Sequence, residues 1–223
     1  MSDADARLST SEVAEAGLAD WRQIMGSLKA RFAVGDFATG LRLVEAIGAF
    51  AERAGHHPAL QVTSTEVIVT LMSHDVGGIT AHDLGLAESI SNAAAALGLR
   101  AEPDGLTQLD LGLDTSHRTE LAPFYAALLG STLHDGEPVD STGQVPTVWW
   151  QEPGDDAEWA LPAQEFDQRW HFDVWVAHDE AERRLQAVLD AGGRLVSDRG
   201  APSFWVIEDA DGNRSCICTP AGR

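Results

Sequence analysis

Three histidines stand where a helix and a strand are expected to end. His56 and His57 follow a helical pattern in ERAGHHP, and His74 follows the apolar run EVIVTLM. Unperturbed imidazole titrates at about pH 6.5, so histidines are suited to moving protons at neutral pH. The ends of a helix and of a neighbouring strand can converge on one concave site. The pattern therefore predicts a proton-transfer site, with Glu52 one helical turn before His56.

Each of these residues also has a purely structural interpretation. Histidines at the end of a helix interact favourably with the helix dipole. His74 could simply be a hydrogen-bonded strand terminus, and Asp83 could complete a capping box with Thr80. Taken singly, the residues leave both interpretations open, and only their combination indicates a function.

Hydrophobic periodicity predicts the elements that position these histidines. A short helix is expected near 11–18 with Ser11 or Thr10 as its cap. Asp36 caps a longer helix in which Phe37, Leu41, Val44, Ile47 and Ala51 recur at helical spacing up to Gly55. Strands are expected at 28–34, 60–63 and 66–73, and a last helix at 80–97. This order predicts an α+β fold, a small antiparallel sheet with two helices on one face.

The second half of the chain repeats one pattern. LDLGLDTSHRTELAPFYAALLG and FDVWVAHDEAERRLQAVLDAGG each read as a strand, a helix and a glycine stop. Copy one is expected to have strands at 108–114, 131–134 and 146–152 and a helix at 119–129. Copy two is expected to have strands at 170–177, 194–197, 203–208 and 215–219 and a helix at 180–189. The sequence therefore predicts a duplicated β-α-β-β-β unit.

Composition and charge limit the classes of partner. The 223 residues carry a formal net charge of −20, which argues against nucleic acid and anionic membranes as partners. Neither a secretory signal nor a membrane-spanning run is visible, so a cytoplasmic protein is expected. Cys216 and Cys218 are two apart in one expected strand and are interpreted as reduced, packed thiols, with a contribution of the C-x-C pair to a metal site as the alternative. The cluster of Gly, Pro and Asp in GLRAEPDGLTQ predicts two domains, 1–103 and 104–223.

The histidine motifs closely resemble the pterin-4a-carbinolamine dehydratase family. The resemblance rests on Glu52-x-x-x-His56-His57-Pro58 and His74-Asp75-x-Gly77-Gly78-x-Thr80-x-x-Asp83, and it covers roughly residues 8–99. It implies a β-α-β-β-α fold and dehydration of a 4a-hydroxytetrahydropterin without a metal or other cofactor. By position His56 and His74 would be the acid/base pair, and His57 would orient the pterin. Glu52, Asp75 and Asp83 would be supporting polar groups.

Two positions depart from the dehydratase pattern. Ser64 replaces an aromatic residue expected in the strand between the two histidine clusters, and Leu60 replaces a tryptophan. Aromatic faces help to hold a flat heterocycle. Losing both is expected to weaken pterin binding more than it impairs proton transfer.

The repeated half resembles the glyoxalase-like, or vicinal oxygen chelate, superfamily over about 106–219. The supporting motifs are PFYAALLG, RWHFDVWV and VIEDADGNRSCIC, in which Ala210 replaces a proline. The resemblance places metal-ligand positions at Gln108, Gln151, His171 and Cys216. Two amides are poor ligands for a hard divalent ion, so no bound catalytic metal is expected. The tryptophans of this half permit an apolar ligand pocket or, equally, a packed core.

Two functions from different classes follow. The first is a dehydratase with an accessory glyoxalase-like domain, acting on a small-molecule pterin. The second is a binding protein in which a weakened dehydratase module and the glyoxalase-like pocket hold a small hydrophobic molecule. A third, lyase or isomerase chemistry in the repeated half, lacks a full ligand set. The dehydratase resemblance also implies a homo-oligomer.

Overall fold

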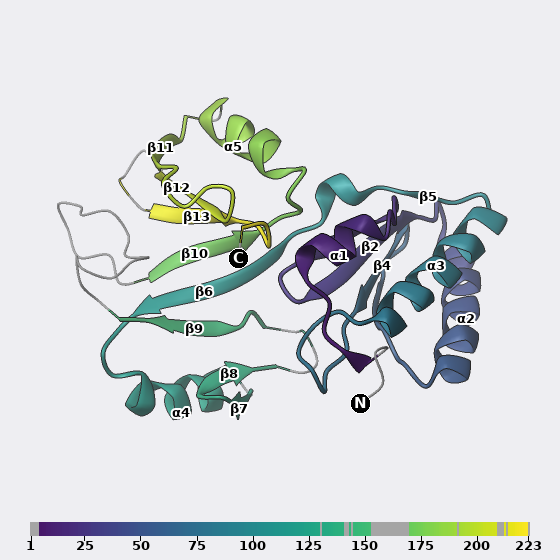
Figure 1. Ribbon diagram of the computed structural model, residues 1–223, viewed down its shortest axis with the longest axis horizontal. Coiled ribbons are helices and arrows are strands. Elements are labelled where there is room, and N and C mark those ends of the chain that lie inside the picture. The colour runs from purple at the N-terminus through teal and green to yellow at the C-terminus, as the bar shows by residue number, and fades with distance from the viewer. Residues whose placement is uncertain are drawn as a thin grey trace. The chain divides into compact units, whose positions relative to one another are not determined.

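The computed structural model describes residues 5–129, 131–140, 143, 145–152, 170–190, 192–208, 212 and 214–222. The chain divides into two compact units between Leu106 and Thr107. Figure 1 shows a sheet with helices in each unit. No helix among the described residues is long and apolar enough to cross a membrane.

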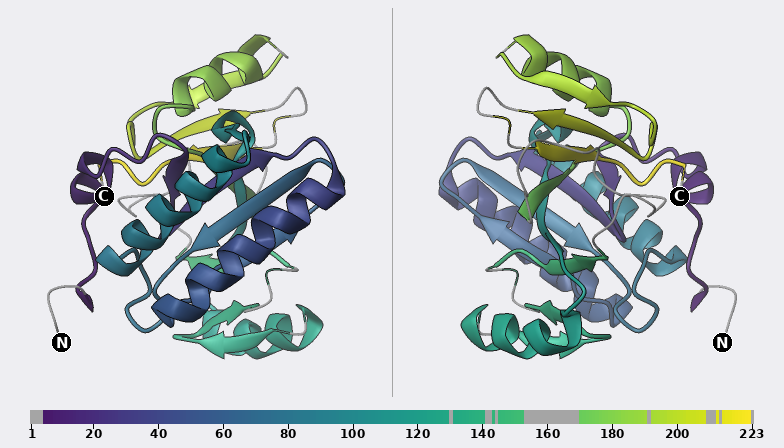
Figure 2. Two further views of the ribbon diagram at one scale, coloured as in Figure 1. Left: turned by 90° about the vertical axis from the view of Figure 1, so that its right-hand side faces the viewer. Right: turned by 90° about the vertical axis from the view of Figure 1, so that its left-hand side faces the viewer.

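The first unit is built on an antiparallel sheet with strand order β1-β2-β4-β3, and β5 pairs with β2. The strands are β1 (Trp21–Ile24), β2 (Ser27–Ala33), β3 (Ala59–Val62), β4 (Glu66–Leu71) and β5 (Arg100–Ala101). The helices are α1 (Thr10–Glu15), α2 (Phe37–Ala54) and α3 (Ala81–Ala96), and the 3-10 turn η2 (Pro103–Gly105) follows β5. Figure 2 shows α2 and α3 side by side over one face of this sheet, as predicted.

The core of this unit lies between the sheet and the two long helices. Phe32, Val69, Leu43 and Ile90 belong to one buried cluster that draws on β2, β4, α2 and α3. Alternation buries every second residue of β4, because successive side chains of a strand point to opposite faces. The sheet and helices thus bury their apolar sides against each other.

The start of α2 confirms the Asp36 cap, whose side chain accepts a hydrogen bond from the Thr39 N–H at 2.8 Å. The apolar stripe is shifted, however. Ile47 and Ala51 are buried as the spacing suggests, whereas Phe37 and Leu41 are 52% and 48% exposed. The buried side of α2 instead runs through residues that include Gly40 and Leu43.

Three details of the first unit differ from the sequence prediction. The cap of α1 is Ser9, which forms a capping box with Glu12, so the prediction of Ser11 or Thr10 was wrong. Strands β1 and β5 were not predicted, because both are short and lack a clear alternation. Ser64 lies in the turn between β3 and β4 and is exposed, so it is not a strand residue.

The second unit contains the predicted repeat. Copy one has β6 (Gln108–Asp114), α4 (Arg118–Leu129), β7 (Thr132–His134), β8 (Glu137–Val139) and β9 (Val148–Gln151). Copy two has β10 (Trp170–Trp175), α5 (Ala181–Asp190), β11 (Arg194–Ser197), β12 (Phe204–Glu208) and β13 (Arg214–Cys218). Strand β8 was not predicted.

Pairing of the strands makes the duplication explicit. In each copy the first strand runs parallel to the last, β6 with β9 and β10 with β13. The first strands of the two copies, β6 and β10, pair antiparallel within a sheet of order β11-β12-β13-β10-β6-β9, and β7 and β8 form a separate hairpin. Cross-strand neighbours share a face of a sheet. Residues of β6, β10 and β13 that are distant in sequence therefore meet on one side.

Candidate functional site

The end of α2 places the first two histidines. Gly55 adopts the left-handed conformation with a φ of 60°, and the backbone N–H of His56 donates to the carbonyl of Ala51 at 3.1 Å. Glycine is favoured there because it has no Cβ to clash. This turn stops the helix and leads His56 and His57 away from its axis.

The start of α3 supplies a buried carboxylate. Thr80 caps the helix, and the capping box with Asp83 is confirmed, since the Thr80 N–H donates to Asp83 Oδ2 at 2.8 Å. The Ser73 hydroxyl, just beyond β4, donates to the same oxygen at 2.8 Å. Asp83 is fully buried. A buried carboxylate requires such donors, because burying an unpaired charge is costly.

The remaining oxygen of Asp83 faces the first histidine. His56 Nε2 lies 2.7 Å from Asp83 Oδ1, and the His56 side chain is 17% exposed. An ionised carboxylate only accepts hydrogen bonds, so the imidazole N–H is the donor. This contact fixes the orientation of the ring and leaves Nδ1 as the nitrogen able to exchange a proton.

The other predicted residues are exposed. His57 Nε2 lies 3.1 Å from Glu52 Oε1, with side-chain exposures of 62% and 79%. His74 and Asp75 lie in an exposed turn that Ser73 and Gly78 close as a β-bridge. The structure thus joins His56 to Asp83 and His57 to Glu52. It also places His74 beside Ser73, a direct partner of Asp83.

Sequence reasoning missed Ser73 as part of this network. Its signal was available, since a hydroxyl residue stands directly before His74 at the end of a strand. A single serine at a strand end usually makes only a local hydrogen bond. Its link to Asp83 depends on the packing of β4 against α3 and could not be read from spacing.

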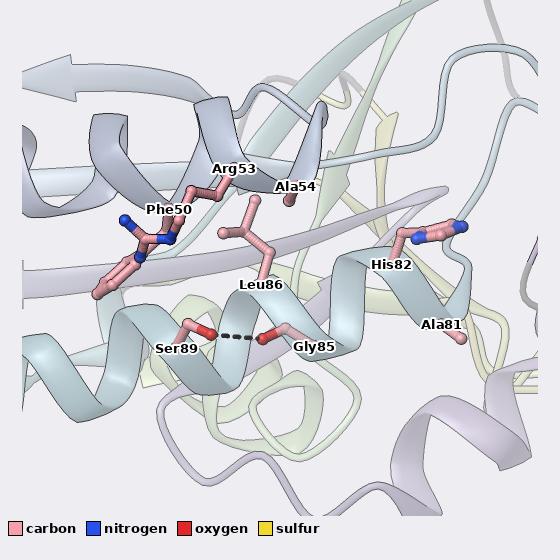
Figure 3. Close-up of a pocket in the computed structure, with 8 residues that line it drawn as sticks. All are labelled: Phe50, Arg53, Ala54, Ala81, His82, Gly85, Leu86 and Ser89. Atoms are coloured by element: carbon pink, nitrogen blue, oxygen red, sulfur yellow. Dashed lines mark hydrogen bonds between the residues drawn. The ribbon is translucent and has the colours of Figure 1, made fainter.

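An open groove of about 380 Å³ lies between α2 and α3. Figure 3 shows the residues that line it, among them Phe50 and Arg53 on α2 and His82, Leu86 and Ser89 on α3. Arg53 stacks on the Phe50 ring at 5.0 Å. The three predicted histidines do not line this groove, so it is distinct from the His56–Asp83 contact.

In the second unit the four predicted ligand positions do not form one site. Gln108 opens β6, whereas Gln151 pairs with Asp114 at the other end of that strand. Six strand residues span roughly 20 Å, which is too far for two ligands of one metal ion. The residues present therefore do not fit the four-ligand arrangement that the resemblance implies. Ala210 lies outside the described residues.

His171 does lie in a polar cluster, with residues that the sequence reasoning did not select. His171 is 3% exposed, its Nε2 is 3.5 Å from Asp173 Oδ1, and its Nδ1 is 3.8 Å from Asp114 Oδ1. Cys216 pairs with Asp173 across β10 and β13. The signal that was available is the alternation LDLGLD in β6, which puts aspartates on the face opposite the leucines.

Burial changes the ionisation of two of these groups. Desolvation lowers the pKa of His171 to about 4 and raises the pKa of Asp114 to about 6. Gly112 in β6 lies opposite His171 in β10, and a Cβ there would come within 2.6 Å of the imidazole. Trp149 meets the same ring edge-on at 5.6 Å between centroids. The imidazole is therefore neutral and closely packed at neutral pH.

Comparison with known proteins separates the same two regions. Residues 6–93 match the family described as Pterin 4 alpha carbinolamine dehydratase, and residues 110–218 match the Glyoxalase-like domain. A Thermosynechococcus vestitus protein named "Putative pterin-4-alpha-carbinolamine dehydratase" is 43% identical over 40% of this chain and 95% of its own length. A protein of the same name from Metallosphaera sedula is 40% identical over 38% of this chain and 90% of its own length.

Two solved structures are also similar. One is described as a "transcriptional coactivator/pterin dehydratase from Brucella Melitensis", with 29% identity, 40% of this chain, 99% of that chain and a TM-score of 0.38. The other is described as "a pterin dehydratase-like protein as a RuBisCO assembly factor in the alpha-carboxysome", with 25% identity, 33% of this chain, 88% of that chain and a TM-score of 0.29. The sequence matches above span nearly the whole length of their relatives, and through them this chain belongs to the pterin-4-alpha-carbinolamine dehydratase family, with a glyoxalase-like domain following the dehydratase region.

Proposed function

We propose that the protein is a hydro-lyase that dehydrates a 4a-hydroxytetrahydropterin. The C4a–O bond breaks as an acid protonates the leaving hydroxyl, and a base removes the proton from N5. A C4a=N5 double bond forms, and the products are a quinonoid dihydropterin and water. The reaction balances without an oxidant or reductant and requires only groups that exchange protons near neutral pH.

The contact that carries this proposal is His56 Nε2 to Asp83 Oδ1 at 2.7 Å. A buried carboxylate that orients an imidazole gives that ring one defined nitrogen for proton transfer, as in other histidine catalysts. We assign His56 and His74 as the acid/base pair and His57, with Glu52, as the group that orients the pterin. Asp83 acts through His56, and Asp75 is a supporting polar group at the His74 turn.

The missing aromatic residues bear on pterin binding. Leu60 is partly buried and packs against the core of the first unit, and Ser64 is exposed. Neither supplies a ring that could stack on the substrate. We therefore expect a high KM with proton transfer retained. The same two positions favour the second candidate, a protein that binds a small molecule without turning it over.

The glyoxalase-like domain is proposed as an accessory module, and we place the domain boundary near residue 103. A cytoplasmic location and a homo-oligomeric state stay predictions. Neither candidate function, dehydration or small-molecule binding, requires nucleic acid. The formal net charge of −20 also argues against nucleic acid as a partner.

The proposal is tested by measuring carbinolamine dehydration with the purified full chain and its His74→Ala variant. His74 is exposed, so its removal should leave the fold intact while lowering the rate by about 100-fold or more, the usual contribution of a general acid or base. His178→Ala, an exposed histidine in the second unit, is the matched control and should retain the full rate. An unchanged rate in His74→Ala would show that this assignment is wrong.

A further inference from the structure

An arginine side chain lies on the turn that carries His74. A Cβ on Gly78 would come within 2.6–2.8 Å of Nε, Cδ and Cγ of Arg7. Gly77 has a positive φ of 57°, whereas Gly78 does not, so the backbone of Gly78 is open to other residues. The space that a side chain at position 78 would need is occupied by Arg7. The glycine therefore serves as the seat of the Arg7 side chain.

The segment that carries Arg7 is fixed on both sides of it. The Leu8 N–H donates to the carbonyl of Ile79 at 2.8 Å. Asp5 Oδ1 lies 3.2 Å from Nε2 of His82, in the first turn of α3. Residues 5–8 thus run beside residues 78–82. A side chain that is already held in place loses less conformational entropy when it binds a ligand.

The seat of Arg7 is close to the proposed acid/base group. Gly78 and Ser73 form the β-bridge that closes the turn, and the Gly77 N–H donates to the carbonyl of His74 at 3.3 Å. Adjacent Cα atoms are about 3.8 Å apart and bridge partners about 4.5–5.5 Å, so the Cα atoms of Gly78 and His74 lie within roughly 10 Å. The long side chain of Arg7 can therefore reach a ligand that contacts the His74 imidazole.

The charge of Arg7 is not used within the part of the chain that the structure describes. The sequence has 35 acidic and 15 basic residues, yet Arg7 forms no ion pair with a described carboxylate, and it is exposed. Arg31 of the same unit, by contrast, is paired with Glu66. A guanidinium presents a planar fork of donors that matches a carboxylate or a phosphate. An anionic ligand is the group that this side chain suits best.

We propose that Arg7 binds an anionic side chain of the pterin, a carboxylate or a phosphate ester. This inference deepens the proposed function and rests on the pterin ligand named there. The pterin ring contacts the histidines, and its substituent extends to the guanidinium above Gly78. Arg7 is a specificity-determining residue, and the proton transfers stay with the imidazoles.

The test is the affinity of the full chain for three pterins, measured through pterin fluorescence. Pterin-6-carboxylate and the phosphate ester of 6-hydroxymethylpterin are anionic, and 6-hydroxymethylpterin is their neutral counterpart. An anionic pterin should bind about 10–100-fold more tightly than the neutral one, the usual gain from hydrogen bonds to a charged group. The comparison of the carboxylate with the phosphate shows which anion Arg7 prefers.

Two variants separate the charge of Arg7 from its position. Arg7→Gln keeps most of the stem without the charge and should remove the anionic preference. Gly78→Ala keeps the charge but displaces the stem, and it should reduce the same preference.

Arg100→Gln is the matched control and should keep the anionic preference. Arg100 is exposed in β5 and pairs with Ala33, which also pairs with Glu66 at the start of β4. The length of β4, roughly 17 Å, therefore separates Arg100 from the His74 turn.

Dehydration kinetics distinguish substrate binding from a structural role. Arg7→Gln should raise KM for the anionic carbinolamines by about 10–100-fold and leave kcat in place. A purely structural role would instead lower kcat for all three substrates.

Equal Kd values of the wild type for anionic and neutral pterins would overturn the inference, even if no variant folded. An anionic preference that persists in Arg7→Gln would place the anion elsewhere and overturn it too. An Arg7-dependent preference without any dehydration would contradict the proposed hydro-lyase and still support this binding role.

Discussion

At the scale of single residues, Asp83 both caps a helix and orients an imidazole. The same carboxylate caps α3 through Thr80 and holds the His56 ring at 2.7 Å. Its buried charge is supported by Ser73 as well. A substitution at this network should therefore affect both stability and proton transfer, because the positioning of the imidazole and the start of the helix depend on one group.

Ser73→Ala tests this coupling. The change removes a buried hydrogen bond to Asp83, which should lower the free energy of unfolding by about 1–3 kcal/mol. It should also lower the dehydration rate, but less than the loss of a histidine, because His56 and the Thr80 contacts remain. Denaturant unfolding and the dehydration assay measure the two effects. Ser89→Ala, whose hydroxyl donates to the Gly85 carbonyl within α3, is the control and should change stability by about 0.5 kcal/mol or less.

At the scale of elements, β6 determines what the second unit can hold on its polar face. Its leucines and aspartates alternate. Gly112 lies between Asp110 and Asp114 on one face of β6, and His171 of the neighbouring strand β10 lies opposite Gly112. A Cβ on Gly112 would be 2.6 Å from the imidazole and 3.1 Å from the Trp149 ring. The glycine is thus required by close packing and not by an unusual backbone angle.

Gly112→Ala should destabilise the second unit by about 1–3 kcal/mol, the usual range for overpacking, and should displace His171. Gly48→Ala is the matched control. Gly48 lies in α2, its added Cβ would meet no atom within 4 Å, and the change should stabilise the protein by about 0.5–1 kcal/mol. Thermal unfolding measures both. Equal stability of wild type and Gly112→Ala would show that the His171 ring is not held against this strand.

Element order was largely predictable from the sequence, and the reasons are local. Asp36 and Gly55 mark both ends of α2, the Thr80–Asp83 pair marks the start of α3, and β6 alternates cleanly. Strands β1, β5 and β8 carry no such signals, because their place depends on a partner strand. The cap of α1 was placed one or two residues too late because three hydroxyl residues follow one another at Ser9, Thr10 and Ser11.

The sites were less predictable because they depend on register. His56, Asp83 and Glu52 were selected from spacing, but the Ser73 contact requires β4 and α3 to pack together. In the second unit, the family resemblance suggested Gln108 and Gln151, which the strand register separates. The proximity of Asp173 and Asp114 to His171 depends on the position of β10 between β6 and β13, which residue spacing does not reveal.

At the scale of the whole molecule, the chain combines two units that each have their own sheet and helices. The dehydratase resemblance predicts a homo-oligomer, and α2 offers two exposed apolar side chains one turn apart, Phe37 and Leu41. Exposed apolar residues of this size are often covered in an assembly. Both lie on the outer side of a helix whose opposite side is buried.

We therefore predict that light scattering will give a mass of at least twice the 23.9 kDa of one chain. Replacing both Phe37 and Leu41 with serine should shift the protein towards the monomer, and the exposed pair Arg42 and Glu45 on the same helix offers control positions. A wild-type mass of one chain would contradict the prediction.

The most direct test of the proposed function is the rate of carbinolamine dehydration with the full chain, wild type against His56→Ala. Wild type should give a saturable acceleration over the uncatalysed reaction. His56→Ala should reduce kcat by about 100-fold or more, because it removes the imidazole that Asp83 orients. Equal rates for the two proteins, or no acceleration by wild type, would contradict the account.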